Sequence, residues 1–410
     1  VPLPTEAPTI STVTISNIQV LLQPILLNGN EFDDADSYQS QALRFLENTL
    51  SSPQTDESYV TYFSLASLFY ASNAVPNKAT EQAGLNDNLL GWLTSSQWVT
   101  DSNYCTWYGI ACNSNNQVER LELANNRMYG IFAPEVQYLA PTLEVIDLFG
   151  NLQLVTEAGD AGNSWIAEMT FLRDLFFGRT AFEYPGIPTF IGALPLLEEI
   201  DFSFTQYTNG PIRADAFANN PLLQRVDLAG NAYTTTVPST ITTHPAIQFL
   251  YLDNIVFANG ITQTLDFLVG MNSLVETWND FTQFGGGLPT ALGTLSSLQS
   301  LSLTFCGLTG TLPTELGNLP IAMDRLWLYQ NMLTGTIPTE LGNLSRMKYL
   351  YLEGNRLAGE MPAGVCNIRD PTGLLTELGS DCNIQNDPRI DCACCTCCGM
   401  FECGDFTRRK

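Results

Sequence analysis

The sequence predicts an α/β repeat solenoid, a fold in which short parallel strands stack into one sheet and return arms connect each strand to the next. The first observation is a 24-residue stretch that occurs three times in succession, at 298–321, 323–346 and 347–370. The second is that the same strand pattern recurs more loosely, at spacings of 24–29 residues, back to Val118. One such unit cannot bury its own apolar core, so the copies must stack.

Each copy follows L-x-x-L-x-L-x-x-N-x-L-x-G-x-x-P-x-x-L-G-x-L, which is typical of leucine-rich repeats of 20–29 residues. The L-x-L part places two apolar side chains on one face of a strand. The Asn at the ninth place can turn inward and pair with backbone turns. The tail T-G-x-I/L-P-x-E-L-G-N-L resembles the plant-type leucine-rich repeat family. That resemblance implies a right-handed superhelix with a concave parallel β-sheet, and binding of proteins, peptides or glycans on the concave face.

Ten repeats are expected between residues 118 and 370. The earlier copies keep the strand but lose the G-x-I/L-P half, so their return arms should be irregular or helical. The expected strand motifs begin at Val118, Leu143, Leu172, Leu197, Leu223, Ile247, Leu274, Leu298, Met323 and Met347.

Two other segments are expected before the repeats. Residues 1–17 are rich in Pro, Thr and Ser, a composition that predicts a linker. Residues 18–117 are predicted to form a helical N-terminal cap. Asp36 or Ser37 can cap its first long helix. Asp56 can cap the next, whose aromatic stripe we interpret as core.

The octet C-x-W-x-G-x-x-C, with Cys105, Trp107, Gly109 and Cys112, resembles the N-terminal cap of plant-type repeats. The resemblance implies that Cys105 and Cys112 form a disulfide and that Trp107 closes the end of the solenoid. Together with the helices before it, the octet is also similar to secreted or membrane-tethered leucine-rich repeat proteins of diatoms, a likeness that covers nearly the whole chain.

Residues 371–410 are predicted to form a cysteine-rich C-terminal cap. Eight cysteines favour four disulfides, whose connectivity the sequence leaves undetermined. Zinc is the alternative, but no His lies near. Cys306 is left over at a ninth position, and we interpret it as a buried free thiol. The eight are Cys366, Cys382, Cys392, Cys394, Cys395, Cys397, Cys398 and Cys403.

The formal net charge of −25 argues against nucleic acid and anionic membranes as partners. No apolar run approaches the roughly 20 residues of a membrane span. The chain also begins without Met or a signal peptide, so we expect a mature extracellular monomer, secreted or tethered outside this chain. The one N-x-S/T site is Asn343, which is either glycosylated or part of an unmodified loop.

Catalysis is not expected. The single His, His244, lies on a return arm, and nothing around it suggests the carboxylate and nucleophile that a catalytic imidazole needs. We therefore expect a binding protein without a resident cofactor.

The predicted concave face carries the candidate ligand-binding residues. Its central column is acidic in the first five strands and aromatic in the last five. Exposed Trp and Tyr dominate interface hot spots, although the rings could merely stack on one another. Trp278 is the least regular, because Thr277 and Asn279 replace the usual core leucines. The acidic residues are Asp147, Asp201 and Asp227; the aromatic ones are Tyr251, Trp278, Trp327, Tyr329 and Tyr351, with Tyr349 and Phe249 beside them.

Three functions are compatible with this face. The first is a receptor-like or cell-wall-associated recognition module for a protein, peptide or glycan. The second is a structural or adhesive extracellular-matrix protein whose acidic strands collect Ca²⁺, a cation that favours oxygen ligands. The third is inhibition of a secreted hydrolase.

Overall fold

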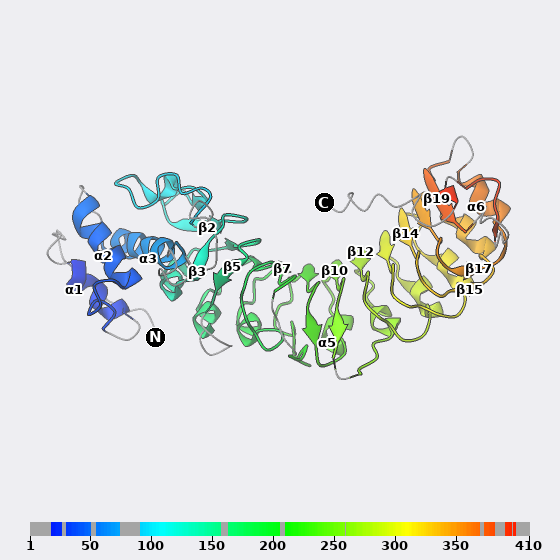
Figure 1. Ribbon diagram of the computed structural model, residues 1–410, viewed down its shortest axis with the longest axis horizontal. Helices are drawn as coiled ribbons and strands as arrows, with labels where there is room; N and C mark the ends of the chain where they lie inside the picture. The colour runs from blue at the N-terminus through cyan, green and yellow to red at the C-terminus, as the bar shows by residue number, and fades with distance from the viewer. Residues whose placement is uncertain are drawn as a thin grey trace, which may run out of the picture. The chain divides into compact units, whose positions relative to one another are not determined.

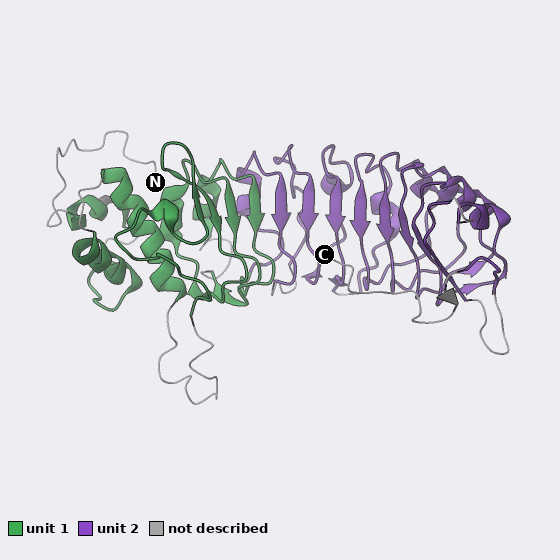
Figure 2. Ribbon diagram, turned by 90° about the horizontal axis from the view of Figure 1, so that it is seen from above, with its two compact units in different colours: residues 1–183 green, residues 184–410 purple. Residues whose placement is uncertain are grey.

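The computed structural model of the chain divides into two compact units, residues 1–183 and 184–410, which we describe in turn (Figure 2). It describes residues 18–26, 30–50, 55–73, 91–156, 163–205, 210–258, 260–369, 373–381, 390–395 and 397–398. The predicted linker at 1–17 lies outside these residues.

Unit 1 begins with helices, as predicted (Figure 1). The hydroxyl of Ser37 accepts a hydrogen bond from the amide of Ser40 and caps the first long helix. The second is capped by Thr55, whose hydroxyl accepts from the amide of Ser58. The prediction of Asp56 as its cap is wrong by one residue, because Asp56 already lies in the first helical turn. The elements are α1 (Ile18–Leu22), η2 (Gln23–Ile25), α2 (Tyr38–Thr49) and α3 (Asp56–Ser72).

Aromatic side chains form the core of this helical part. Trp107 is 1% exposed, and its ring packs 6.0 Å from Phe45 and 5.1 Å from Trp98. Tyr62, from the predicted stripe on α3, lies 5.7 Å from the same ring. A disulfide joins Cys105 to Cys112 at the edge of this cluster.

The strands of unit 1 follow the helices. β1 pairs antiparallel with β2, and the next strands of the sheet are parallel. The elements are η5 (Tyr104–Thr106), β1 (Ile110–Cys112), β2 (Val118–Glu122), β3 (Tyr129–Ile131), η6 (Pro134–Leu139), β4 (Val145–Asp147), β5 (Gln153–Val155), η7 (Ser164–Glu168) and β6 (Asp174–Phe176).

Unit 2 contains the long run of parallel strands that the repeats predict, and the repeat solenoid is confirmed. Each strand begins two residues after its expected motif, because L-x-x-L leads into the strand. The register places Trp327 opposite Ser302 on one side and Tyr351 on the other. The strands are β7 (Glu199–Asp201), β8 (Arg225–Asp227), β10 (Phe249–Tyr251), β12 (Glu276–Trp278), β13 (Ser300–Ser302), β14 (Arg325–Trp327) and β16 (Tyr349–Tyr351).

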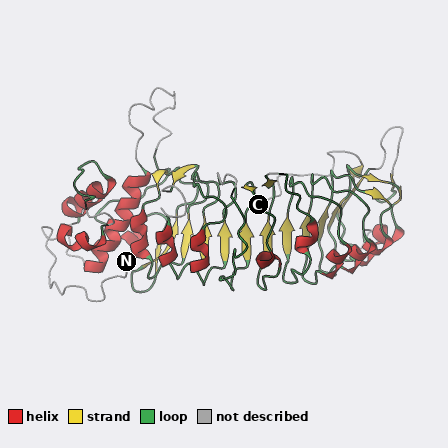
Figure 3. Ribbon diagram, turned by 90° about the horizontal axis from the view of Figure 1, so that it is seen from below, coloured by secondary structure: helices red, strands yellow, loops and turns green. Residues whose placement is uncertain are grey.

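The return arms of unit 2 carry short helices and two-residue strands (Figure 3). Where the sequence has the x-P-T motif, a helix begins directly after the proline, whose fixed φ suits that position. The elements are η8 (Thr189–Ala193), β9 (Ala232–Tyr233), α5 (Ser239–Thr242), β11 (Val256–Phe257), η9 (Leu265–Leu268), η10 (Thr290–Thr294), η11 (Thr314–Asn318), β15 (Thr334–Gly335), η12 (Thr339–Asn343), β17 (Arg356–Leu357), β18 (Gly359–Glu360) and α6 (Ala363–Asn367).

The ninth position of each repeat is buried and holds the turn after the strand. Asn331 shows how: its amide nitrogen donates to the carbonyls of Leu303 and Leu328, and its amide oxygen accepts from the amide of Cys306. The eighth position has positive φ in many repeats, as at Asn125 and Gly230. Two residues at this eighth position, Phe281 and Phe305, belong to the candidate binding face described below.

Parallel pairing continues past residue 370 into the predicted cap. β19 (Glu377–Ser380) pairs with β16, and β21 (Cys397–Cys398) pairs with β19. β20 (Ile390–Asp391) pairs with β18. Disulfides join Cys366 to Cys394 and Cys392 to Cys395, whereas Cys382 and Cys403 lie outside the described residues. Among the described residues, no helix is long and apolar enough to cross a membrane.

Candidate ligand-binding face

The register of unit 2 brings the predicted aromatic residues together on the exposed side of the strands. The rings of Trp327 and Tyr351 stack with centroids 5.6 Å apart, and Tyr329 meets Tyr351 edge to face at 6.1 Å. Tyr251 and Trp278 lie 5.3 Å apart on the neighbouring strands β10 and β12. Parallel strands lie only about 4.8 Å apart, so large side chains of one column must contact each other.

This contact corrects the expectation that the aromatics all face solvent. Tyr251 is only 8% exposed, and Tyr329 and Tyr351 are each 6% exposed. Trp278 and Trp327 are half-buried. Thr277 and Asn279 beside Trp278 are fully buried, so Trp278 does stand on the strand face.

Tyr251 and Phe249 belong to a polar network across the strands. The guanidinium of Arg225 lies 4.3 Å from the centre of the Phe249 ring and donates to Tyr251 Oη at 2.9 Å. Tyr251 Oη in turn donates to Glu276 Oε1 at 2.7 Å. Arg325 forms an ion pair with the other oxygen of Glu276 at 3.5 Å. These contacts give Tyr251 a structural role.

Two further aromatic residues, Phe281 and Phe305, were not predicted from the sequence. Phe281 is 44% exposed, and its ring stacks on that of Phe305 at 4.8 Å with an angle of 10° between the planes. Phe305 then meets Tyr329 edge to face at 5.9 Å. We name the group on this side of unit 2 the aromatic patch; it consists of Phe281, Phe305, Trp327, Tyr329, Tyr349 and Tyr351.

Phe281 and Phe305 both occupy the eighth position with φ of 57°, in the left-handed region. For L-residues that region costs about 1–2 kcal/mol, and bulky side chains there are outliers. The other eight repeats also have positive φ at this position, five of them with Gly or Asn and three with Arg179, Phe204 or Gln330, so the left-handed turn belongs to the repeat itself. Phe at this position in two consecutive repeats was the sequence signal that could have found the stacked pair.

The acidic residues of the predicted column have backbone partners. A carboxylate oxygen of Asp147, Asp201 and Asp227 accepts the amide two residues further on. Burial, and then the neighbouring carboxylate of Asp201, raise the pKa of Asp227 to about 8. Among the described residues, no group of three or more His, Cys, Asp or Glu is arranged to hold a metal ion.

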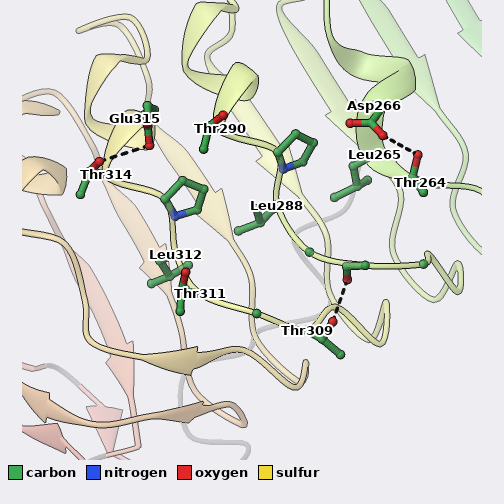
Figure 4. A pocket seen from close by; sticks show the side chains of 16 residues that line it. Thr264, Leu265, Asp266, Leu288, Thr290, Thr309, Thr311, Leu312, Thr314 and Glu315 are labelled. Carbon is green, nitrogen blue, oxygen red and sulfur yellow. Dashed lines mark hydrogen bonds between the residues drawn. The ribbon is translucent and has the colours of Figure 1, made fainter.

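A separate groove of about 630 Å³ lies on the return arms of unit 2 (Figure 4). The run Gly285–Gly287 lines it without side chains, and threonine hydroxyls and two carboxylates surround it. Thr264 donates to Asp266, and Thr314 donates to Glu315. The sequence analysis named none of these residues. The groove is open, and its carboxylates are already hydrogen-bonded, so we give it less weight than the aromatic patch.

The remaining candidate residues have structural surroundings. His244 is 8% exposed, its Nε2 lies 3.1 Å from the carbonyl of Asn220, and burial lowers its pKa. Cys306 is a free, buried thiol that donates to the carbonyl of Asn279. Asn343 is exposed at the end of η12.

Comparisons with known proteins agree with this architecture. Residues 297–319 match the leucine rich repeat family. No curated protein matches the chain in sequence. Among solved structures, a TDR receptor is 24% identical with a TM-score of 0.54, and the match covers 63% of this chain and 43% of that chain.

Two further structures share the fold. The leucine-rich repeat ectodomain of the plant membrane receptor kinase GASSHO1/SCHENGEN3 from Arabidopsis thaliana, in complex with Casparian strip integrity factor 2, is 22% identical with a TM-score of 0.55; 76% of this chain and 34% of that chain are covered. A leucine-rich repeat protein of Leptospira interrogans is 23% identical with a TM-score of 0.51, over 63% of this chain and 61% of that chain.

The fold is therefore that of a leucine-rich repeat protein. The chain spans less than half the length of either receptor chain.

Proposed function

We propose that this chain is a recognition module whose aromatic patch binds a protein or peptide partner. The observation that carries the proposal is the stacked pair Phe281 and Phe305, held in left-handed backbone conformation at the end of the strands. The two stacked rings, with Phe281 44% exposed, add apolar surface beside the half-buried Trp327 and Tyr349. Contiguous exposed apolar surface of this kind usually marks a contact with a partner.

The likeness to a plant receptor ectodomain supports the class of partner. That ectodomain was solved in complex with Casparian strip integrity factor 2. In this chain the accessible members of the aromatic patch are the exposed Phe281 and the half-buried Phe305, Trp327 and Tyr349, which come from four successive repeats. A patch that crosses several strands suits an extended peptide.

An extracellular location is part of the proposal. The disulfides Cys105–Cys112 and Cys366–Cys394 persist in oxidising compartments. The cap sequence resembles secreted or tethered diatom proteins, and the exposed Asn343 would carry the glycan. Expression in a secreting eukaryotic cell tests the glycan: treatment with an N-glycosidase should lower the mass of wild type and leave Asn343→Gln unchanged.

Calcium binding by the acidic strands is a second proposal, supported by the register that places Asp201 on β7 opposite Asp227 on β8. Burial, and then the carboxylate of Asp201, raise the pKa of Asp227, so a bound cation would offset an unfavourable charge. Calorimetry with CaCl₂ would detect binding. The double change of Asp201 and Asp227 to Asn should remove the signal, and an unchanged signal would place any calcium elsewhere.

Selection from a displayed random-peptide library tests partner binding and does not require an identified partner. The full chain should enrich a family of peptides, and Trp327→Ala should weaken their binding by about 30-fold, the effect of losing a hot-spot residue of roughly 2 kcal/mol. Failure to enrich any family, or equal binding by Trp327→Ala, would contradict the proposal.

A further inference from the structure

Three buried polar atoms in or beside the aromatic patch have no hydrogen-bond partner among the described residues. They are Nε1 of Trp327, Oε2 of Glu353 and Oγ1 of Thr304, the residue before Phe305. A buried polar group without a partner is costly, and native structures contain few of them. Oε2 of Glu353 lacks a donor and therefore points to a ligand that supplies one, whereas Nε1 of Trp327 is itself a donor and would need an acceptor.

Glu353 stands on the same side of the chain as the patch. It follows Tyr351 by two residues, while Leu352 between them is 1% exposed and points into the core. Its side chain is 4% exposed. The next carboxylate along this side, Asp381, differs, because its two oxygens accept hydrogen bonds from the amides of Gly354 and Asn355. Oε2 of Glu353 has no such contact within the described part of the chain.

The aromatic rings near Glu353 face in different directions. The ring planes of Tyr329 and Tyr351 make an angle of 74°, and those of Phe305 and Tyr329 make an angle of 80°. Ring faces attract cations through their quadrupole, and a carboxylate nearby adds a full negative charge. The hydroxyl of Tyr351 donates to a second carboxylate, Glu377. The formal net charge of −25 also favours a cationic partner.

We propose that the aromatic patch takes up a Lys or Arg side chain of the partner, with its charged end over the ring faces and Glu353 as the counter-ion. This inference rests on the proposed function and names the chemistry of its ligand. Neutral apolar side chains would gain the ring contacts but would leave the carboxyl of Glu353 unmatched.

Proton linkage gives the inference a second readout. Burial, and then the carboxylate of Asp381, raise the pKa of Glu353 to about 7. The other titratable side chains of this region are Glu377 and the neutral phenols of Tyr329, Tyr349 and Tyr351. A bound cation favours the ionised carboxyl, so binding releases a proton and affinity increases as the pH rises through about 7.

The direct test uses the full chain and two small probes of nearly equal shape. N-acetyl-arginine amide carries the cation, and N-acetyl-citrulline amide is its neutral counterpart. In aromatic-labelled NMR spectra, the arginine probe should shift the ring signals of Trp327 and Tyr351 saturably, and the citrulline probe should bind at least fivefold more weakly. Glu353→Gln should reduce the arginine affinity to the citrulline level.

The outcomes separate this inference from the proposed function. Equal binding of the two probes, or absence of binding by both, overturns the assignment of a cationic ligand. The proposed function would still be supported by library peptides whose binding depends on the aromatic patch. If Glu353→Gln does not fold, the pH dependence on wild type decides: arginine affinity that does not rise between pH 6 and about 8 overturns the inference. Selected peptides without a conserved basic residue also contradict it.

Discussion

Arg225 and Tyr251 are joined by a hydrogen bond of 2.9 Å from the guanidinium Nη1 to the phenol Oη. The same oxygen donates to Glu276, so one hydroxyl links strands β8, β10 and β12. Tyr251, which the sequence predicts to be a ligand-binding residue, therefore helps to stabilise the sheet.

The first prediction follows from this link. Tyr251→Phe keeps the ring but removes the hydroxyl, so Arg225 and Glu276 each lose one hydrogen bond. The free energy of unfolding should fall by about 1–2 kcal/mol, measured by urea denaturation. Tyr108→Phe, with a ring that is 40% exposed, is the control and should change little. Equal stability of Tyr251→Phe and wild type would mean that the link contributes nothing.

The second prediction concerns Glu135, which is 2% exposed and accepts hydrogen bonds from Gln39 and Tyr38 of α2. Burial raises its pKa from 4.5 to about 7. Because the folded pKa lies above the unfolded one, the stabilising contribution is complete below pH 4.5 and is lost as the pH rises through about 7. The loss is at most about 3 kcal/mol.

Thermal unfolding between pH 4.5 and 8 measures this effect. Glu135→Gln is neutral at every pH, so the variant should gain stability relative to wild type as the pH rises. Other buried carboxyls make the stability of both proteins depend on pH. The effect of Glu135 is therefore the difference between the stability–pH curves of wild type and Glu135→Gln. A constant difference across this range would show that Glu135 is ionised throughout.

The strand positions could be predicted from sequence, because L-x-L alternation is local and repeats itself. Trp278 was placed correctly on the strand face even though Thr277 and Asn279 replace the usual leucines. The burial of Tyr251, Tyr329 and Tyr351 could not be predicted in the same way. It depends on neighbours about 22–27 residues away in the chain, whose rings cover them.

Phe281 and Phe305 were missed for a different reason. They lie just beyond the strand, where alternation no longer decides which way a side chain points. Their backbone conformation is set by the left-handed turn that follows the strand in each repeat, where Gly, Asn, Arg, Gln and Phe all occur. The ring stack therefore became visible only in the structure.

The third prediction concerns the thiols. Burial raises the pKa of Cys306, so its thiol should resist alkylation in the native chain. Under denaturing, non-reducing conditions, mass spectrometry should find one adduct, at Cys306, and eleven after reduction. Additional adducts between Cys392 and Cys403, or bound zinc, would contradict the assignment of that segment to disulfides.

The fourth prediction separates stability from binding at the patch. Changing Phe281 and Phe305 to Gly relieves two left-handed positions, worth about 1–2 kcal/mol each. It also loses the ring stack and the apolar contacts of both side chains and gives the unfolded chain more freedom, effects of similar total size and opposite sign. The midpoint of thermal unfolding should therefore stay close to that of wild type. A large fall would show that the two rings are needed for folding, and would remove the argument that a partner explains them.

The affinity of one library-selected peptide for this double variant tests the central claim most directly. The matched control is Phe204→Gly, because Phe204 is 43% exposed and has φ of 50° at the same repeat position, but lies outside the patch. Titration calorimetry should show at least a 30-fold weaker affinity for the double variant and an unchanged affinity for Phe204→Gly. Equal affinity of the double variant and wild type would contradict the assignment of the aromatic patch as the binding site.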